Sequence, residues 1–210
     1  MIPNTEDYGG VTYMWDDGTA IAYCPMSDYG YPLDFRGVVQ HEAGGHGFGK
    51  LGDEYIYHTS FISSCTCTCC FHPSSWDSEH SRNEYMNLSL SGKMSDVPWR
   101  DFIFHEKYSN FVDIFEGGYM HSRGVFRSEQ NSCMNNEIPY YSTISRYSIV
   151  KRIMEYAGEE FSFDKFVEND IVEVVNTEST KSAGEFSLTA KTAAMNSHTP
   201  VHMGEKPLLK

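Results

Sequence analysis

The sequence predicts an α+β fold in which a small sheet precedes a central helix and another helix follows later in the chain. Two β-prone runs, residues 11–15 and 19–23, flank Asp16-Asp17-Gly18, a turn sequence typical of a β-hairpin. Apolar residues at helical spacing then predict helices over residues 34–49 and 142–157.

The central helix has a start signal and a stop signal. Asp34 can cap its N-terminus, because an Asp side chain accepts hydrogen bonds from the free N–H groups of a first turn. Four apolar residues surround this start: Leu33, Phe35, Val38 and Val39. Gly47 and Gly49 are expected to end the helix.

The later helix, residues 142–157, has clear boundaries as well. Ser142 can cap its N-terminus, and Gly158 stops it. One face collects its apolar side chains: Tyr147, Val150, Met154 and Ala157. This face predicts packing against the rest of the domain.

The stretches outside these helices are less regular. Residues 59–100 are rich in Ser and Asn, which predicts a long irregular segment, with a helical piece expected around 83–90. Residues 102–104 and 111–115 predict short strands or extended pieces. Ile171–Val175 is a further strand candidate.

The length of 210 residues predicts one domain, or one domain with a small appendage. At 40% hydrophobic residues the chain can bury a core. We place the domain at residues 1–175. Residues 176–210 have no clear core pattern, so we expect a tail, a linker or the start of a further domain there.

The chain is acidic, with 29 Asp and Glu against 16 Lys and Arg and a net charge of −13. This balance argues against nucleic acids and anionic membranes as partners. No run approaches the roughly 18 apolar residues of a membrane helix, so we expect no membrane insertion. No signal peptide opens the chain.

Four of the six cysteines fall close together: Cys65, Cys67, Cys69 and Cys70. Their spacings match none of the usual C-x₂-C zinc patterns, although a second zinc site stays an alternative. Disulfides formed in an oxidising compartment are the favoured interpretation, with the pairing left open.

The most informative motif is His41-Glu42-Ala43-Gly44-Gly45-His46. In the common zinc motif HExxH the histidines are four residues apart, about 40° apart around the helix axis, so both reach one zinc. The glutamate then reaches the water on that zinc. Here the spacing is five, which on a regular α-helix separates the two side chains by about 140°.

One inserted residue can be absorbed by a π-bulge, a local turn with i→i+5 bonding that is frequent at functional sites. Gly44 and Gly45 lack a Cβ and tolerate such a distortion. We therefore predict a π-bulge at Ala43–Gly45 that places His41 and His46 on one face as zinc ligands. Glu42 is the expected general base.

A catalytic zinc usually has three protein ligands and an open fourth position. Asp53 is the expected third ligand, because the glycine-rich exit of the helix can turn the chain back. Glu54 competes with it, and since adjacent residues point in different directions only one of them binds. If Asp53 is instead a solvated turn residue, a distant histidine such as His121 takes its place.

The run HEAGGHGFGKLGDEY, residues 41–55, resembles the active-site segment of the bacterial IgA-peptidase-type zinc metalloendopeptidases, which are metzincin-like. GVFRSEQNSCMNN, residues 124–136, resembles a downstream segment of the same family. The third-ligand spacing departs from metzincins, since Asp53 lies seven residues after His46 and not six. Because the family has a longer N-terminal part, the resemblance implies a chain truncated there.

The resemblance implies a metzincin-like zincin catalytic domain. It has a zinc helix, a small sheet before it, a Met-turn at Met134 and a C-terminal helix. In such enzymes a strand ahead of the zinc helix pairs with an extended substrate, which implies a protein or peptide partner here. Tyr119 is a candidate oxyanion donor, although a buried structural tyrosine is favoured. A secreted, periplasmic or cell-surface location is also implied.

Together these observations predict a zinc-dependent endopeptidase, in which Glu42 assists attack of a zinc-bound water on the peptide bond. Two alternatives stay open. One is a non-catalytic binding module that keeps zinc as structure. The other is a gluzincin-like exopeptidase, whose third ligand would be a helical glutamate, and Glu155 is the candidate.

Overall fold

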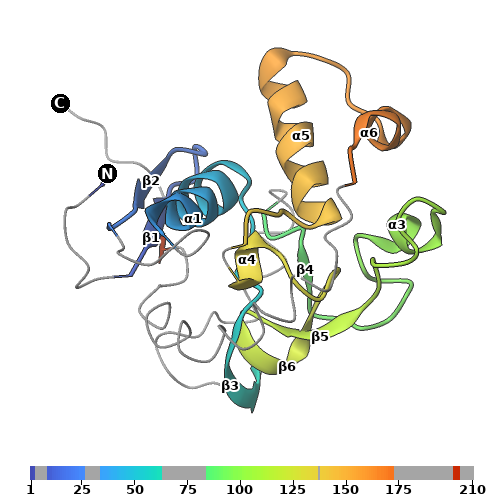
Figure 1. The fold of residues 1–210 in the computed structure, drawn as a ribbon, viewed down its shortest axis with the longest axis horizontal. Helices are drawn as coiled ribbons and strands as arrows, with labels where there is room; N and C mark the ends of the chain where they lie inside the picture. The colour runs from blue at the N-terminus through green and yellow to red at the C-terminus, as the bar shows by residue number, and fades with distance from the viewer. Residues whose placement is uncertain (3–8, 27–33, 63–83, 137, 173–200, 204–210) are drawn as a thin grey trace.

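Two small sheets and several helices make up the described part of the chain (Figure 1). The computed structural model describes residues 1–2, 9–26, 34–62, 84–136, 138–172 and 201–203. The fold is a mixed α+β fold, as predicted, in which helices and strands interleave along the chain.

The first sheet has the strand order β2-β1-β7. β1 (Val11–Met14) and β2 (Ala20–Tyr23) pair antiparallel, which confirms the predicted hairpin. Gly18 in its turn has a φ of 84°, a value that glycine adopts without strain. β7 (Val201–His202) adds to the other side of β1 in parallel, and the Met203 N–H donates to the Met14 carbonyl at 2.7 Å.

The second sheet is built around its longest strand, β6 (Met120–Arg127). β3 (Ile56–Phe61) pairs with β6 in parallel, and β4 (Leu88–Ser89) and β5 (Phe115–Gly118) pair with it antiparallel. A buried apolar cluster joins this sheet to the first: Met14, Ile62, Tyr85, Leu88, Tyr119 and Val125.

The central helix starts as α1 (Phe35–Val39) and continues as a π-helix, η1 (Gln40–Phe48). Asp34 caps it as predicted, since its carboxylate accepts from the Arg36 N–H at 3.0 Å. Gly49 follows directly after the last helical residue. β1 and β2 both pack against η1, so the first sheet lies beside this helix (Figure 1).

The later helix, α5 (Thr143–Ala157), runs as predicted from the Ser142 cap to Gly158, which has a left-handed φ of 69°. Its Ile144 joins a second buried cluster together with residues from α3 (Arg100–Phe104), from the segment that follows it, and from α6 (Phe163–Asn169). Phe102 packs edge-on against Tyr147 and Phe166 within this cluster.

Three sequence predictions differ from the structure. Residues 102–104 lie in α3, because Trp99, Phe102 and Ile103 pack on one side at helical spacing. Residues 84–90 form turns and β4, with Tyr85 at a left-handed φ of 55° that no helix interior contains. No strand forms at 171–172, where Ile171 is 81% exposed.

Other predictions fall outside the described residues: the cysteine cluster at 65–70, the rest of the strand predicted up to Val175, and residues 176–200.

Lys50 connects the end of the central helix to two other parts of the chain. Its carbonyl accepts from the Tyr85 N–H at 2.7 Å. The buried Lys50 ammonium donates to the Gly18 carbonyl at 3.0 Å and so ties the end of the central helix to the hairpin turn.

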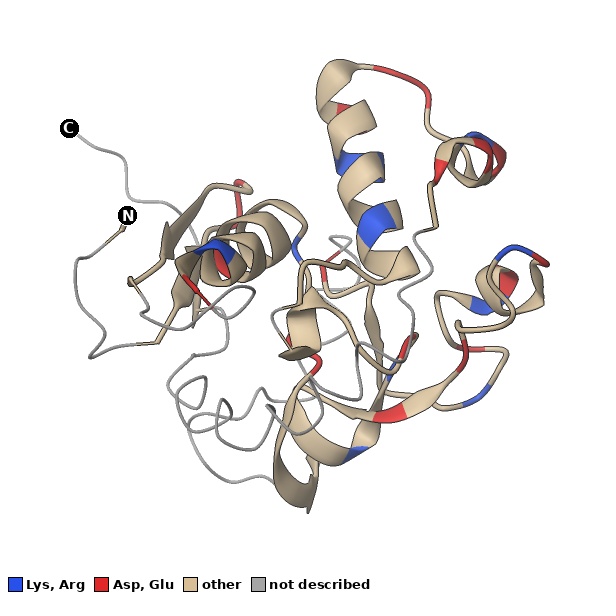
Figure 2. Ribbon diagram, in the orientation of Figure 1, with Lys and Arg blue, Asp and Glu red and all other residues tan. Residues whose placement is uncertain are grey.

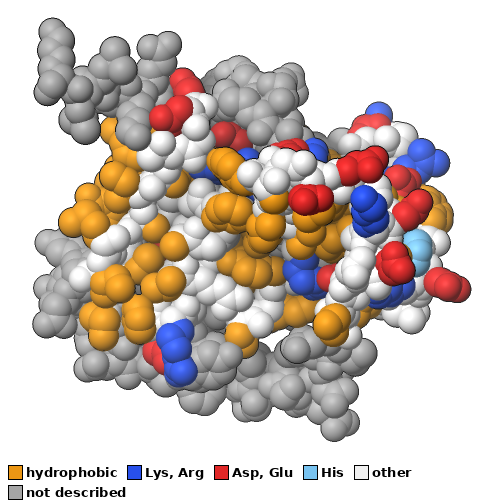
Figure 3. Space-filling view, turned by 90° about the horizontal axis from the view of Figure 1, so that it is seen from above, with side chains coloured by type: hydrophobic (Ala, Val, Ile, Leu, Met, Phe, Trp, Pro, Cys, Tyr) orange, Lys and Arg blue, Asp and Glu red, His pale blue; other side chains and the backbone are white. Residues whose placement is uncertain are grey.

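Charged side chains of both signs lie on α5, α6 and α3 (Figure 2). The surface seen in Figure 3 also carries several groups of apolar side chains. Among the helices in the described ranges, none combines the length and the apolar character needed to cross a bilayer.

Candidate metal centre

Three buried side chains converge beside the central helix. The Nε2 atom of His41 lies 3.0 Å from Asp53 Oδ1, and the Nε2 atom of His46 lies 3.1 Å from the same oxygen. The potential ligand atoms of the three residues all lie within 4.8 Å of one another. Each residue is at most 2% exposed. This cluster could hold a metal ion.

The π-helix is what brings the two histidines together. The Gly49 N–H donates to the Gly44 carbonyl at 2.9 Å, an i→i+5 hydrogen bond. The two imidazole rings face each other edge-on, with centroids 4.7 Å apart. A regular α-helix would hold them about 140° apart around its axis. The predicted π geometry is confirmed, and it extends beyond Ala43–Gly45 to the whole of η1.

The two glycines of the motif also make room for neighbours. A Cβ on Gly44 would collide with the hydroxyl of Tyr141, which donates to the Gln40 carbonyl at 2.5 Å. A Cβ on Gly45 would collide with the sulfur of Met134. Gly44 and Gly45 therefore permit close packing against the helix in addition to its distortion.

Hydrogen bonds at the Nδ1 atoms fix the orientation and the tautomer of the two histidine rings. The Nδ1 atom of His41 lies 3.0 Å from the Cys133 carbonyl, and that of His46 lies 2.7 Å from the Leu51 carbonyl. Carbonyl oxygens only accept, so each Nδ1 carries the hydrogen, and in the neutral ring Nε2 keeps its lone pair. Such backbone contacts are typical of metal-binding histidines.

The donor set fits a divalent cation such as zinc. Two Nε2 lone pairs and a carboxylate oxygen face one another without a proton donor between them. His46 Nε2 and Asp53 Oδ2 are buried with no hydrogen-bond partner, a costly arrangement that a bound cation would relieve. Two imidazoles and one carboxylate are common ligands of zinc.

The charge of Asp53 suits this role. Burial alone would raise the pKa of its carboxyl group, but positive charge on His46 and His41 and hydrogen bonds from their rings outweigh burial, and the pKa lies well below its usual range. A bound divalent cation would supply the same positive charge when the rings are neutral. The carboxyl group is therefore ionised at neutral pH.

The competing ligand candidates lie elsewhere. Glu54 points to the other side of the chain, where its carboxylate accepts from Asn87 at 2.8 Å and from Ser132 at 2.5 Å. Burial raises the pKa of Glu54 to about 7. His121 contacts Ser60 and lies beside His58 on β3. Glu155 is 51% exposed and faces Lys151. Of these candidates the structure brings only Asp53 to the two histidines.

Glu42 lies on the same helix, next to His41 in sequence, and is 1% exposed. Its Oε2 accepts a hydrogen bond from the Thr12 hydroxyl at 2.7 Å, and Gly10 packs directly against its carboxylate. Burial raises the pKa of Glu42, although the nearby His46 and His41 oppose this effect. A raised pKa suits a group that both takes up and releases a proton near neutral pH.

Met134 lies beneath the helix in α4 (Cys133–Asn136) and is fully buried against Gly45. Its neighbour Cys133 supplies the carbonyl that holds His41. Tyr119 is buried in the core against Tyr85, which agrees with its structural interpretation.

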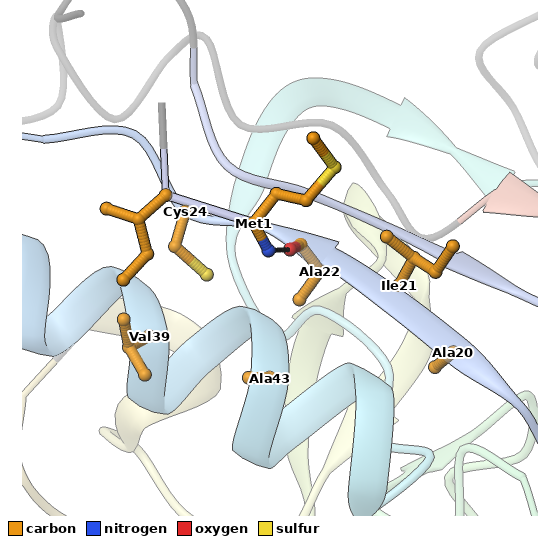
Figure 4. Close-up of a pocket in the computed structure, with 8 residues that line it drawn as sticks. Met1, Ala20, Ile21, Ala22, Cys24, Val39 and Ala43 are labelled. Carbon is orange, nitrogen blue, oxygen red and sulfur yellow. Dashed lines mark hydrogen bonds between the residues drawn. The ribbon is translucent and has the colours of Figure 1, made fainter. Parts of the chain in front are cut away.

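An apolar pocket of about 470 Å³ borders the same helix (Figure 4). It is lined by Met1 and Ile2, by residues of β2 with Cys24, and by Val39 and Ala43. The Met1 amine donates to the Ala22 carbonyl at 2.6 Å. Burial raises the pKa of the Cys24 thiol to about 11, so the thiol is protonated at neutral pH. This lining suits an apolar group and not a metal ion.

Several partners of the site were not predicted from the sequence: Thr12, Asn87, Ser132 and Tyr141. Only Thr12 could have been recognised from a local sequence pattern. Thr12 is a polar residue on the face of β1 that it shares with the buried Met14, where an apolar side chain is expected. The others lie far from the motif in sequence and have no local pattern.

Comparison of the chain with protein-family models and with curated proteins finds no match. The chemistry of the site therefore rests on its own residues.

Proposed function

We propose that this chain is a zinc-dependent endopeptidase, with His41, His46 and Asp53 as the metal ligands and Glu42 as the general base. One observation carries the proposal: the ligand atoms of His41, His46 and Asp53 converge without a proton donor, next to a glutamate on the same helix. The likeness of residues 41–55 to the active-site segment of IgA-peptidase-type metalloendopeptidases supports it.

Each residue has a defined part in the reaction. His41 and His46 present neutral Nε2 atoms, because backbone carbonyls hold their Nδ1 hydrogens. Asp53 adds one negative charge to the ligand set. Zinc bound there supplies a Lewis acid that polarises a carbonyl group and acidifies water. Glu42 accepts a proton at its carboxylate and then delivers it to the leaving amine.

Thr12 orients the base. Its hydroxyl donates to Glu42 Oε2, which leaves Oε1 as the oxygen that can exchange a proton. β1, which carries Thr12, pairs on both sides through its backbone. An extended peptide could therefore join this sheet by strand addition only along its edge strands, β2 and β7.

One observation favours a second function, a non-catalytic module with a structural metal. His41, Glu42, His46 and Asp53 are all at most 2% exposed, and structural zinc sites are closed whereas catalytic sites keep an open position. Structural zinc does not need Glu42, so a variant of this residue separates the two functions.

The deciding experiment compares the wild type with Glu42→Gln and with the exposed control Glu155→Gln. Zinc content is measured by metal analysis, and cleavage is measured on an unfolded protein substrate. We expect all three proteins to bind one zinc ion and Glu42→Gln to lose cleavage by at least about 100-fold. The Glu155→Gln control also tests the exopeptidase alternative, since it should cleave like the wild type.

Full activity of Glu42→Gln would overturn the catalytic mechanism. If all three proteins bind zinc and none of them cleaves the substrate, the structural module would be favoured.

A further inference from the structure

Asp53 is held in place by its backbone more than by its side chain. Its Oδ1 faces the two histidines and its Oδ2 has no hydrogen-bond partner. The Asp53 carbonyl, in contrast, accepts from the Tyr119 N–H at 2.8 Å. The position of the carboxylate therefore depends on what fixes residues 52–54.

The side-chain amide of Asn87 brackets this segment. Its Oδ1 accepts from the Gly52 N–H at 2.9 Å, and its Nδ2 donates to the Gly52 carbonyl at 2.9 Å. The same nitrogen donates to Glu54 Oε1 at 2.8 Å. One side chain thus binds the residues on both sides of Asp53, in the manner of a paired strand. Asn87 is fully buried, directly before β4.

The hydrogen bonds continue from Glu54 to His41. Glu54 Oε2 accepts from Ser132, and the Glu54 N–H donates to the Met134 carbonyl at 2.8 Å. Between these two residues lies Cys133, whose carbonyl holds His41. The network that starts at Asn87 therefore reaches two of the three candidate ligands through buried groups.

We propose that Asn87 is a positioning residue for the metal site, which sets the place of the Asp53 carboxylate by bracketing Gly52 and Glu54. This inference rests on the proposed function, because it needs Asp53 to bind a metal. Partners of metal ligands typically change metal affinity by about 10–100-fold when they are removed.

A residue that only stabilises the fold would also weaken metal binding, so the test must separate the two roles. Asn87→Ala removes the bracket and leaves the polar groups of Gly52 unpaired. Ser89→Ala is the matched control on the next strand, since Ser89 is also buried but its hydroxyl bonds only Ser91. A double-mutant cycle with Asp53→Ala shows whether Asn87 acts through Asp53.

Zinc affinity of the full chain is measured by competition with a chelator, and Co²⁺ replaces zinc to report ligand geometry by its absorption spectrum. We expect Asn87→Ala to weaken zinc binding about 10–100-fold and to change the Co²⁺ spectrum. Ser89→Ala should match the wild type. In the Asp53→Ala background, adding Asn87→Ala should cause a much smaller further loss of affinity, because only the route to His41 through Glu54 remains.

Unchanged zinc affinity in Asn87→Ala, or an equal loss in the Asp53→Ala background, would overturn this proposal alone. A wild-type chain that binds no zinc would overturn the proposed function and this proposal with it. If Asn87→Ala does not fold, Asn87→Asp replaces it, because it keeps the acceptor for Gly52 and loses the donor. If neither variant folds, Asn87 is a folding residue and the proposal is wrong.

Discussion

Gly45 of the π-helix lies in direct contact with Met134 of α4, and no side chain fits between them. Gly45→Ala would force the buried methionine or the helix to move, and overpacking of this kind costs about 1–3 kcal/mol. We expect a lower free energy of unfolding in urea and weaker zinc binding. Gly47→Ala is the milder control, because its Cβ would lie 3.3 Å from the Glu42 carbonyl oxygen, which has to shift by only a few tenths of an ångström.

Trimming Met134 should relieve the clash. In the Met134→Ala background, Gly45→Ala should lower the free energy of unfolding by less than it does in the wild type. The two residues are in contact, so their effects are not additive. Equal costs in both backgrounds would show that Gly45 is needed for the shape of the helix and not for packing.

Asp53 and Glu54 are adjacent, both buried and both acidic, yet they should differ sharply in metal binding. Asp53→Ala removes a charged candidate ligand, so zinc affinity measured by chelator competition should fall by orders of magnitude. Glu54→Gln keeps an acceptor oxygen for the Asn87 amide and turns an N–H toward the Ser132 hydroxyl oxygen, which can accept, so its affinity should stay within about tenfold of the wild type. The reverse order would transfer the ligand role to Glu54.

Thr12→Val keeps the shape of the side chain and removes the hydroxyl that donates to Glu42. A hydrogen bond to a charged group contributes about 1.5–3 kcal/mol, so we expect kcat/KM for peptide cleavage to fall about 10–100-fold. Zinc content should not change. Thr12→Ser retains the hydroxyl and should restore most of the activity, and failure of this rescue would argue against the role of the hydrogen bond.

Lys50 should make stability depend on pH in the alkaline range. Burial lowers the pKa of this lysine to about 8, from an ordinary value of 10.5. Between these values the unfolded chain binds more protons than the folded one, so the contribution of Lys50 to the free energy of unfolding rises with pH. Below about pH 8 lysine is charged in both states and its unfavourable contribution is constant.

The measurement is urea unfolding at several pH values from 7.5 to 10.5 for the wild type and Lys50→Met. The free energy of unfolding of the wild type, relative to that of Lys50→Met, should increase as the pH rises through this window. Lys165→Met, which alters an exposed lysine, is the control and should show no such trend. A constant difference for Lys50→Met would contradict the prediction.

The metal-site geometry could be predicted where it depends on local spacing. A sequence separation of five between His41 and His46 is incompatible with one face of an α-helix, and this leads directly to the π-helix. The hairpin and α5 also follow from local turn and cap residues. The position of Asp53 beside the histidines could also be predicted, because the glycine-rich segment after the helix lets the chain turn back.

Elements set by distant contacts could not be predicted in the same way. Tyr85 and its neighbours are held by the Lys50 carbonyl and by β6, so a helical composition does not produce a helix there. Three consecutive apolar residues at 102–104 fit a strand or a helix equally, and packing of Phe102 against α5 and α6 decides the outcome. The contacts of Thr12 and Asn87 join parts of the chain that no local pattern connects.

The pairing of β7 with β1 implies an order of assembly during synthesis. The strands of the β1–β2 hairpin are joined by a short turn, and such hairpins form within about 1–10 μs. A growing chain is extended at about 5–20 residues per second, so Val201 and His202 leave the ribosome many seconds after β1. The hairpin can meet the helix that carries Glu42 early, while the strand that holds Thr12 gains its second neighbour only when residues 201–202 have been made.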